Sequence, residues 1–552
     1  MDWNTHQVFN QFSELANYNL LDTDPALHEA LERSGAGWAR PSLQAYAGEL
    51  GRSETYALAQ DANRHTPELR AFDTRGRRID QVDFHPSWHQ LMAMYRGQGL
   101  ISQPFEETRA GRWAAWAAGF YLHGQIEQGA LCPATMTQAC IPLIQREAGL
   151  WAELKDKLYS HAYDARDLPA AQKHSVWIGM GMTEKQGGSD VRANTTVATP
   201  VAGGGRGGEY LLRGHKWFFS APMCDAHLVV ARTGEGGPFA CFYVPRWRPD
   251  GTKNAVHVQR LKDKVGNRSN SSSEVEFHDA WGLLMGEEGR GIPTIIEMAT
   301  YTRLNCVAGS AAILRQATVQ AIHYARQRQA FGKRLAEQPL MRAVLADLAL
   351  ESEAALAITM RLAQAYENAH DPLERAWSRL LTPAAKFWVC KRGVELTGEA
   401  MEVLGGNGYV LEGIQGRLFL ESPVNSIWEG SGNVMCLDVL RALQREPEAA
   451  RLLLAELAPI ARADAPVAAA LARVQALLAL PAEQLEALGR MLVQDLVLVA
   501  QACLLRQHAP AAVADAFIAT RLGSAGSGGR IAGAIDTRAI DVNALLQRAL
   551  PH

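Results

Sequence analysis

The chain has 552 residues, of which 47% are hydrophobic and 20% charged, and its formal net charge is −3. This length exceeds a single hydrophobic core and suggests about three or four domains. The composition excludes a disordered chain and a global attraction for polyanions. The eight cysteines are scattered without a C-x-x-C pair, which favours reduced, mostly buried thiols.

The ends of the chain carry no targeting pattern. The opening MDWNTHQVFNQF has neither a basic segment nor an apolar core, so we expect no secretory signal. The most apolar late stretch, MLVQDLVLVAQACLL, is interrupted by Gln494 and Asp495 and is shorter than a bilayer span. We therefore expect a cytoplasmic protein without a membrane segment.

Composition and periodicity change three times along the chain. Residues 1–176 are rich in helix-forming residues, and a β-domain is predicted over residues 177–283 from short β-branched and aromatic runs between Gly, Pro and Asn. Long amphipathic patterns over residues 284–441 predict a helical bundle, and residues 442–552 an appended helical domain. We expect a mostly helical α+β protein with no internal repeat.

Common nucleotide and metal motifs are missing. No G-x-G-x-x-G opens a helix after a strand, and no P-loop, H-E-x-x-H or paired C-x-x-C occurs, which argues against Rossmann and P-loop enzymes. His85 and His89 lie four residues apart, but Pro86 separates them and no third ligand is near. A structural histidine pair is favoured over a metal site, and we predict no bound metal.

Two neighbouring stretches suit a flat, phosphorylated ligand. GMGMTEKQGGSDVRANTT, residues 179–196, gathers hydroxyls and backbone N–H groups in one loop. Trp217, Phe218 and Phe219 follow on a predicted strand, so one face could pack against a ring system. Taken singly, each stretch is also typical of an ordinary turn or core strand.

An acidic residue in NSIWEGSGNVM is the candidate base. Glu429 lies between Trp428 and Gly430, and a carboxyl against apolar surface loses hydration as an anion. Its pKa should therefore rise toward the range useful for proton transfer. The alternative is a solvated acid in a turn beside a packed tryptophan.

Five stretches in order resemble motifs of the acyl-CoA dehydrogenase family: MTEKQGGSD, KVGNRSNSSSEVEF, RQAFGKRL, AMEVLGGNGY and IWEGSGNVM. The resemblance implies an N-terminal helical domain, a middle β-barrel or sandwich and a C-terminal four-helix bundle, here with an extra C-terminal helical domain. GHKWFFS and PVNSIWEGSGNVMCLDVLR further resemble the AidB-type alkylation-response subfamily, and this likeness thins after about residue 445.

The resemblance implies an FAD cofactor between the β-domain and the bundle. A partner subunit's arginine reaches the pyrophosphate in this family, which suits a planar guanidinium, and Arg328 matches it. A solvated charge at a helix end is the alternative for Arg328. The cofactor role implies a homotetramer, a dimer of dimers. The expected cofactor residues are Met182, Thr183, Gly188, Ser189, Trp217, Phe218, Phe219, Ser220, Arg328, Phe331, Gly405, Gly406, Ile427, Trp428, Gly430, Ser431 and Asn433.

Glu429 matches the family's catalytic base, which removes the proton next to a thioester while a hydride leaves the adjacent carbon for the flavin. The site must also stabilise the developing enolate. Departures from the family pattern bear on the substrate. Leu420 and Glu421 stand where Arg-Asp is frequent, Glu402 stands where Gln is frequent, and Trp428 replaces a tyrosine.

The resemblance implies association with double-stranded DNA in the adaptive response to alkylating agents, with weak dehydrogenase activity on short branched acyl-CoA such as isovaleryl-CoA. The alternative is a genuine dehydrogenase of fatty-acid or branched-chain amino-acid breakdown with no DNA role. Residues 441–552 hold eleven Arg, no Lys and ten Asp plus Glu, so ordinary solvated arginines fit this composition equally well. Arg441 and Arg521 match subfamily stretches and are the expected nucleic-acid residues. The small-molecule partner would be an acyl-CoA or an alkylating agent.

Overall fold

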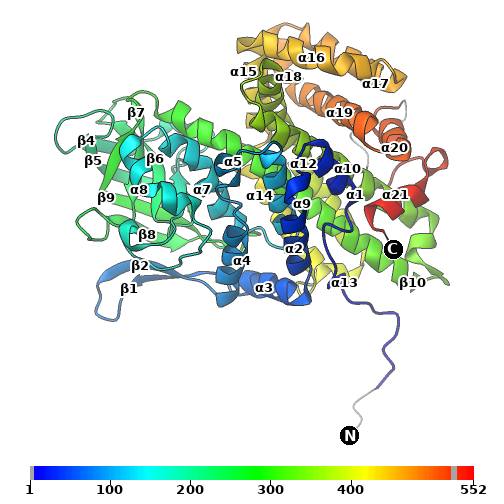
Figure 1. The fold of residues 1–552 in the computed structure, drawn as a ribbon, viewed down its shortest axis with the longest axis horizontal. Helices are drawn as coiled ribbons and strands as arrows, with labels where there is room; N and C mark the ends of the chain where they lie inside the picture. Colours follow the sequence, from blue (N-terminus) through cyan, green and yellow to red (C-terminus); the bar gives the residue numbers. More distant parts are fainter. Residues whose placement is uncertain (1–4, 524–530, 552) are drawn as a thin grey trace. The chain divides into compact units, whose positions relative to one another are not determined.

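The structure is a computed structural model, in which residues 5–523 and 531–551 are described (Figure 1). The chain divides into two compact units, and each is described by itself. The helical unit comprises Met1–Tyr56, Trp113–Ile126 and Cys306–His552, and the mixed unit comprises Ala57–Arg112 and Glu127–Asn305. These units cut across the expected N-terminal domain, and the four domain boundaries stay predictions.

A closed β-barrel forms the centre of the mixed unit. Strand β6 pairs with β4 on one side and with β7 on the other, and the path β6-β4-β5-β9-β7 returns to β6. Most pairs are antiparallel, and β3 and β4 run parallel to β6. The expected β-domain is confirmed, and β4 and β5 form an antiparallel hairpin within it. The strands are β3 (Ile178–Gly181), β4 (Val197–Pro200), β5 (Glu209–Ser220), β6 (Ala226–Thr233), β7 (Phe239–Pro245), β8 (Val256–Leu261) and β9 (Ser272–Met285).

The barrel core is aromatic and β-branched. Tyr210, Phe219, Phe242 and Phe277 are at most 2% exposed and pack with Leu212 and valines from neighbouring strands. The mixed unit also contains the two-stranded sheet β1 (Glu68–Phe72) with β2 (Arg78–Asp83) and the helices α4 (Pro86–Gly97), α5 (Gln103–Glu106), α7 (Leu131–Ile144) and α8 (Ala148–Tyr159). Helix α3 (Ser53–Arg64) contributes residues to both units.

Long helices build the helical unit, and α9 (Gly291–Gln327) contributes residues to both units. The helices of the first part are α1 (Pro25–Arg33), α2 (Arg40–Leu50), α6 (Arg112–Gly124), α10 (Pro339–Glu367), α11 (Pro372–Ala376), α12 (Thr382–Val403), α13 (Gly406–Tyr409), α14 (Ile414–Ile427) and α15 (Gly432–Arg445). A short hairpin joins α9 to α10 through β10 (Gln329–Ala330) and β11 (Lys333–Arg334).

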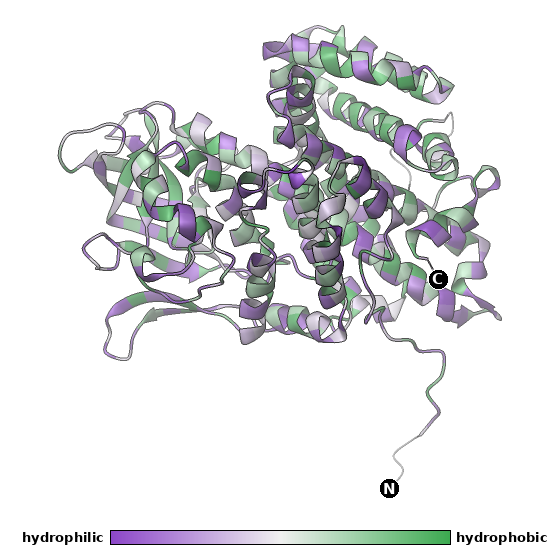
Figure 2. Cartoon of the chain, in the orientation of Figure 1, coloured by the Kyte–Doolittle hydropathy of each residue, from purple (hydrophilic) through white to green (hydrophobic). Residues whose placement is uncertain are grey.

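The appended region is helical as expected. It comprises α16 (Pro447–Ala461), α17 (Ala465–Leu478), α18 (Ala482–Ala487), α19 (Gly489–His508), α20 (Ala511–Arg521) and α21 (Val542–Ala549). The apolar stretch noted in the sequence is α19, which packs against α10, α12 and α17. Figure 2 shows α19 largely in the colour of hydrophobic residues, as expected for a helix that buries most of its surface. No helix in the described residues is long and apolar enough to cross a membrane.

Candidate active site

A buried ion pair holds the loop that follows β3. Glu184 is 1% exposed, and its carboxylate accepts hydrogen bonds from the Lys216 ammonium at 2.8 Å and from the Thr195 N–H at 2.7 Å. Burial opposes ionisation of Glu184, but Lys216 and these donors outweigh it and lower its pKa to about 2. Glu184, the acid of the MTEKQGGSD motif, therefore holds the loop through buried hydrogen bonds, while Gly188 and Ser189 remain exposed.

The two faces of β5 have different roles. Phe218 is 52% exposed, and the Lys262 ammonium lies 4.5 Å from its ring centre and 3.6 Å from that of Trp217. Ser220 follows two residues after Phe218 and so lies on the same face. An exposed phenyl ring beside a hydroxyl fits a flat heterocycle.

Phe219 lies on the other face of β5. It is 1% exposed in the barrel core, and its ring stacks on His227 with 3.8 Å between ring centres. The expectation that Phe219 contacts a cofactor does not fit this placement, because its side chain points away from the face that exposes Phe218. Phe219 instead packs in the barrel core, on the opposite side of the strand from Phe218.

Glu429 occupies a strained break between two helices. Helix α14 ends at Ile427 and α15 begins at Gly432, and Glu429 adopts a left-handed backbone conformation with φ of 58°. Gly430 follows with φ of 105°, and a Cβ there would lie 2.3 Å from the Met435 Cε. A non-glycine residue held in this region costs free energy, and such strain clusters at functional sites.

A buried lysine fixes this break. Lys386, on α12, is 1% exposed, and its ammonium donates a 2.6 Å hydrogen bond to the Gly430 carbonyl. Burial raises the pKa of the nearby Cys306 thiol, and the charges of Lys386 and Glu429 act on it in opposite directions. Sequence reasoning missed Lys386, although its place in the apolar helical run PAAKFWVCK is unusual for a solvated lysine.

The other expected residues of this region lie at or near the helix ends. Ile427 is 66% exposed, and the Trp428 indole N–H donates to the Asn425 side chain at 3.1 Å. Ser431 is the first residue before α15, and the Asn433 side-chain oxygen accepts a 2.8 Å hydrogen bond from Arg490 of the appended region. The glycines Gly405 and Gly406 are exposed at the start of α13.

The β10–β11 hairpin presents an aromatic ring to solvent. Phe331, at its tip, is 99% exposed with φ of 54°. The Arg328 guanidinium is partly buried and donates to the Asn10 carbonyl, while the Asn10 side chain donates to the Gln329 carbonyl at 2.8 Å. Within one chain, Arg328 therefore ties the hairpin to the N-terminal segment.

The two arginines expected to contact nucleic acid differ in exposure. Arg441 is exposed on α15. Arg521 is 9% exposed and forms ion pairs with Asp347 and, at 2.8 Å, with Glu351, both on α10. A phosphate contact for Arg521 does not fit this placement, because its guanidinium is buried against two carboxylates.

The histidine pair has structural partners. The His85 ring caps α4 by accepting from the Ser87 N–H at 3.3 Å and stacks on His65 at 4.6 Å. His89 shares a 2.7 Å hydrogen bond with the Tyr163 hydroxyl. Within residues 5–523 and 531–551, no group of three His, Cys, Asp or Glu side chains could hold a metal ion. The eight cysteines are buried and form no disulfide.

Three models of known protein families match successive segments of this chain. Residues 10–165 match the family model of the adaptive response protein AidB N-terminal domain, residues 179–280 the acyl-CoA dehydrogenase middle domain and residues 289–444 the acyl-CoA dehydrogenase C-terminal domain. The chain is 47% identical to AidB of Escherichia coli (strain K12) over 528 residues, which cover 95% of this chain and 96% of that protein.

Two matches from Caenorhabditis elegans extend the comparison. Acyl-CoA dehydrogenase family member 11 is 28% identical over 71% of this chain and 65% of its own length. The crystal structure of ACDH-11 in complex with C11-CoA superposes with a TM-score of 0.83 at 23% identity, covering 99% of this chain and 93% of that one, which shows a shared fold. The chain therefore belongs to the acyl-CoA dehydrogenase family of FAD-dependent oxidoreductases, in the branch that carries an AidB N-terminal domain.

Proposed function

We propose that this protein binds FAD and oxidises short branched acyl-CoA thioesters such as isovaleryl-CoA, with Glu429 as the catalytic base. The observation that carries this proposal is the left-handed backbone of Glu429 in a break between α14 and α15 that a buried lysine ties down. An ordinary solvated acid in a turn needs neither the strain nor the buried ammonium.

The residues of the mixed unit fit the cofactor. The exposed Phe218 ring offers a flat apolar surface, and Gly188 and Ser189 leave backbone N–H groups and a hydroxyl open for phosphate. Bound FAD would supply the hydride acceptor. Glu429 would take the proton next to the thioester carbonyl, and Lys386 would hold the loop that carries it.

Trp428 favours a small acyl group. Its indole is larger than the tyrosine that is usual at this position, and the 3.1 Å hydrogen bond to Asn425 fixes its ring. A relative of similar fold was crystallised with C11-CoA, so acyl-CoA thioesters are a supported substrate class. The added bulk of Trp428 is expected to shorten the accepted acyl chain.

The test replaces the base and keeps its shape. Glu429→Gln should purify with FAD bound but lose flavin bleaching by isovaleryl-CoA under anaerobic conditions by about 10²-fold or more. The matched control is Glu483→Gln, an exposed acid on α18, which should bleach like the wild type. Equal bleaching of Glu429→Gln and wild type would show that the base lies elsewhere.

We also propose that the protein associates with double-stranded DNA in the response to alkylating agents. Four arginines, all exposed, form no ion pair among the described residues: Arg441, Arg445, Arg462 and Arg490. Arg441 and Arg445 are four residues apart on α15 and so lie on one face. Unpaired exposed guanidinium groups suit phosphates.

A salt series tests the DNA proposal. The double variant Arg441→Gln/Arg445→Gln should weaken duplex binding and lower the slope of log affinity against log salt by about 2. The control Arg451→Gln/Arg538→Gln removes the same charge from arginines paired with Glu448 and Asp536 and should change little. Failure of wild type to retain DNA at low salt would leave the alternative, an acyl-CoA dehydrogenase of fatty-acid or branched-chain amino-acid breakdown.

A homotetramer is proposed from exposed apolar side chains of the helical unit. Phe331 is 99% exposed, Leu340 87%, Tyr409 79% and Leu411 56%. Large apolar side chains this exposed are typical of surfaces that another protein covers. Sedimentation of the wild type should give a mass near four chains, and Phe331→Asp should lower it.

We further propose a cytoplasmic location for this protein.

A further inference from the structure

A cavity of about 250 Å³ lies within the mixed unit, between β2, α4, the segment 163–173 and the β5–β6 turn. Residues expected to contact FAD do not contribute to its wall. Five aromatic side chains line it: Phe84, Trp88, His89, Tyr163 and Trp177. Met92, Met223 and Cys224 complete the apolar part. The cavity therefore has the aromatic and sulfur-containing wall that flat ring systems prefer.

Contacts within the protein hold the side chains of the cavity wall in place. Phe84 stacks on Trp88 with 3.9 Å between ring centres, and His89 hydrogen-bonds Tyr163. Arg96 is 0% exposed, lies 4.7 Å from the ring centre of Trp177 and donates to the carbonyls of Ser160 and Val176 at 2.9 and 3.0 Å. A preorganised pocket loses little side-chain entropy on binding.

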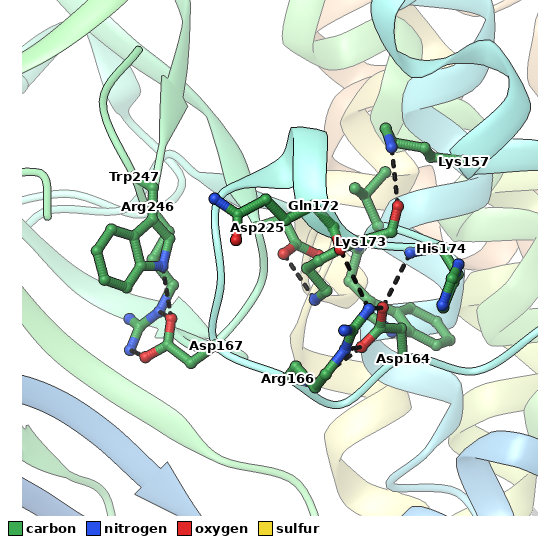
Figure 3. Close-up of polar contacts among 12 residues, drawn as sticks. Lys157, Asp164, Arg166, Asp167, Gln172, Lys173, His174, Asp225, Arg246 and Trp247 are labelled. Atoms are coloured by element: carbon green, nitrogen blue, oxygen red, sulfur yellow. Dashed lines mark hydrogen bonds and ion pairs between the residues drawn. The ribbon is translucent and has the colours of Figure 1, made fainter. Parts of the chain in front are cut away.

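Ion pairs form the polar side of the cavity (Figure 3). Asp167 accepts two hydrogen bonds of 2.9 Å from Arg246 and one of 2.8 Å from the Trp247 indole N–H. It also accepts one of 2.7 Å from Lys253. Asp164 is paired with Arg166 at 2.6 Å, and Lys173 with Asp225 at 2.7 Å. The residues that line the cavity include three cations, Arg166, Lys173 and Arg246, and two carboxylates, Asp164 and Asp167, so the wall carries one net positive charge.

Two buried hydrogen-bond donors in the wall lack partners among the described residues. Trp88 is 2% exposed and Trp177 is 6% exposed, and neither indole N–H has a hydrogen-bond partner within residues 5–523 and 531–551. A buried donor without a partner costs free energy. Both side chains line the cavity, so an acceptor group on a bound ligand could serve as the partner of either N–H.

We propose that this cavity is a binding site for a flat aromatic monoanion of two fused rings. Size supports two rings, because an apolar cavity of about 150 Å³ holds one benzene, and this one measures about 250 Å³. The aromatic wall favours ring stacking, and the net positive charge of the wall together with the two unpartnered N–H groups favours a carboxylate substituent. The class is that of an aromatic carboxylic acid, not an acyl-CoA.

Calorimetric titration of the FAD-bound protein with 2-naphthoate tests the site. Wild type should bind one equivalent, and binding should weaken for 2-naphthalenemethanol, which lacks the charge, and for cyclohexanecarboxylate, which lacks the aromatic ring. Met223→Trp should fill the cavity and weaken binding by about tenfold or more. The matched control Met491→Trp replaces a methionine on α19 that is 47% exposed and should bind like the wild type.

Crystals soaked with 6-bromo-2-naphthoate give an answer that does not depend on a folded variant. The anomalous signal of bromine should lie between α4 and the β5–β6 turn. Absence of binding by the wild type, equal binding by Met223→Trp, or bromine located only elsewhere would each overturn the proposal.

Discussion

The buried ammonium of Lys386 donates a 2.6 Å hydrogen bond to the main-chain carbonyl of Gly430, the residue that follows the candidate base. The carbonyl belongs to a glycine in the left-handed region, so the bond holds a backbone conformation that the chain alone disfavours. Helix α12 thereby fixes the position of Glu429 through the main chain. Lys386 is a positioning residue.

Replacing Lys386 should impair chemistry more than cofactor binding. In Lys386→Met the Gly430 carbonyl loses its charged donor, which is worth about 1.5–3 kcal/mol, and the Glu429 loop should relax. We expect kcat for isovaleryl-CoA to fall by about tenfold or more with a smaller change in KM, because a misplaced base acts on the chemical step. Rapid anaerobic bleaching of bound FAD measures the step directly.

Lys155→Met is the control, since Lys155 is exposed on α8, a helix of the mixed unit. A purely structural role for Lys386 predicts lower thermal stability with an unchanged kcat in the molecules that remain folded. That result would contradict the positioning role.

Gly430 should tolerate no side chain. Its φ of 105° is unfavourable for any L-residue, and the added methyl would meet the buried Met435. We expect Gly430→Ala to lose about 1–3 kcal/mol of unfolding free energy and to lose dehydrogenase activity. Gly393→Ala serves as control, because that glycine lies inside α12 with only an ordinary 3.8 Å contact; it should be stabilised by about 0.5–1 kcal/mol. Urea unfolding of both variants distinguishes the two outcomes.

Local patterns predicted much of the fold. Gly- and Pro-bounded runs of β-branched residues located the barrel strands, and helical periodicity located the bundle and the appended helices. The motif order predicted the family. Alternation along β5 predicted that Phe218 and Phe219 face opposite sides, with Trp217 on the side of Phe219. The register with β9 is irregular between Lys216 and Phe219, and the Lys262 ammonium lies beside the rings of both Trp217 and Phe218. This irregularity and the choice of the buried side depend on pairing with β9, which the local sequence does not reveal.

Long-range partners explain what sequence reasoning missed. Arg521 is buried because Asp347 and Glu351 face it from α10, more than a hundred residues earlier. The Lys386 ammonium donates to the carbonyl of Gly430, which lies 44 residues later in the chain, in the break between two other helices. Neither pairing leaves a local pattern, because charged residues in helices are usually solvated and the sequence alone gives no partner.

The pH dependence of the free energy of unfolding should change sign when the ion pair between Lys216 and Glu184 is removed. In wild type the pKa of Glu184 is lowered from 4.5 to about 2, so its stabilising contribution is complete above pH 4.5 and is lost as the pH falls toward 2. In Lys216→Met the buried carboxylate loses its cation, and burial should raise its pKa above 4.5. This variant should therefore lose stability as the pH rises through that value.

Urea unfolding between about pH 4 and about pH 7 measures the change. Lys155→Met, which removes an exposed lysine on α8, should keep the wild-type slope. A Lys216→Met protein whose stability follows the wild-type pH profile would show that Glu184 does not depend on this ion pair.

Arg521 should matter for stability and not for DNA. Arg521→Met leaves Asp347 and Glu351 buried, and among the described residues the cation that remains paired with them is Arg392, at 3.3 Å from Glu351. Removing one partner of a buried pair costs about 3–5 kcal/mol, so we expect a lower urea midpoint. At a temperature where the variant stays folded, its duplex affinity and salt slope should equal those of wild type, whereas Arg441→Gln should lower both. A selective loss of DNA binding in folded Arg521→Met would contradict the buried placement, because only an accessible guanidinium can contact phosphate.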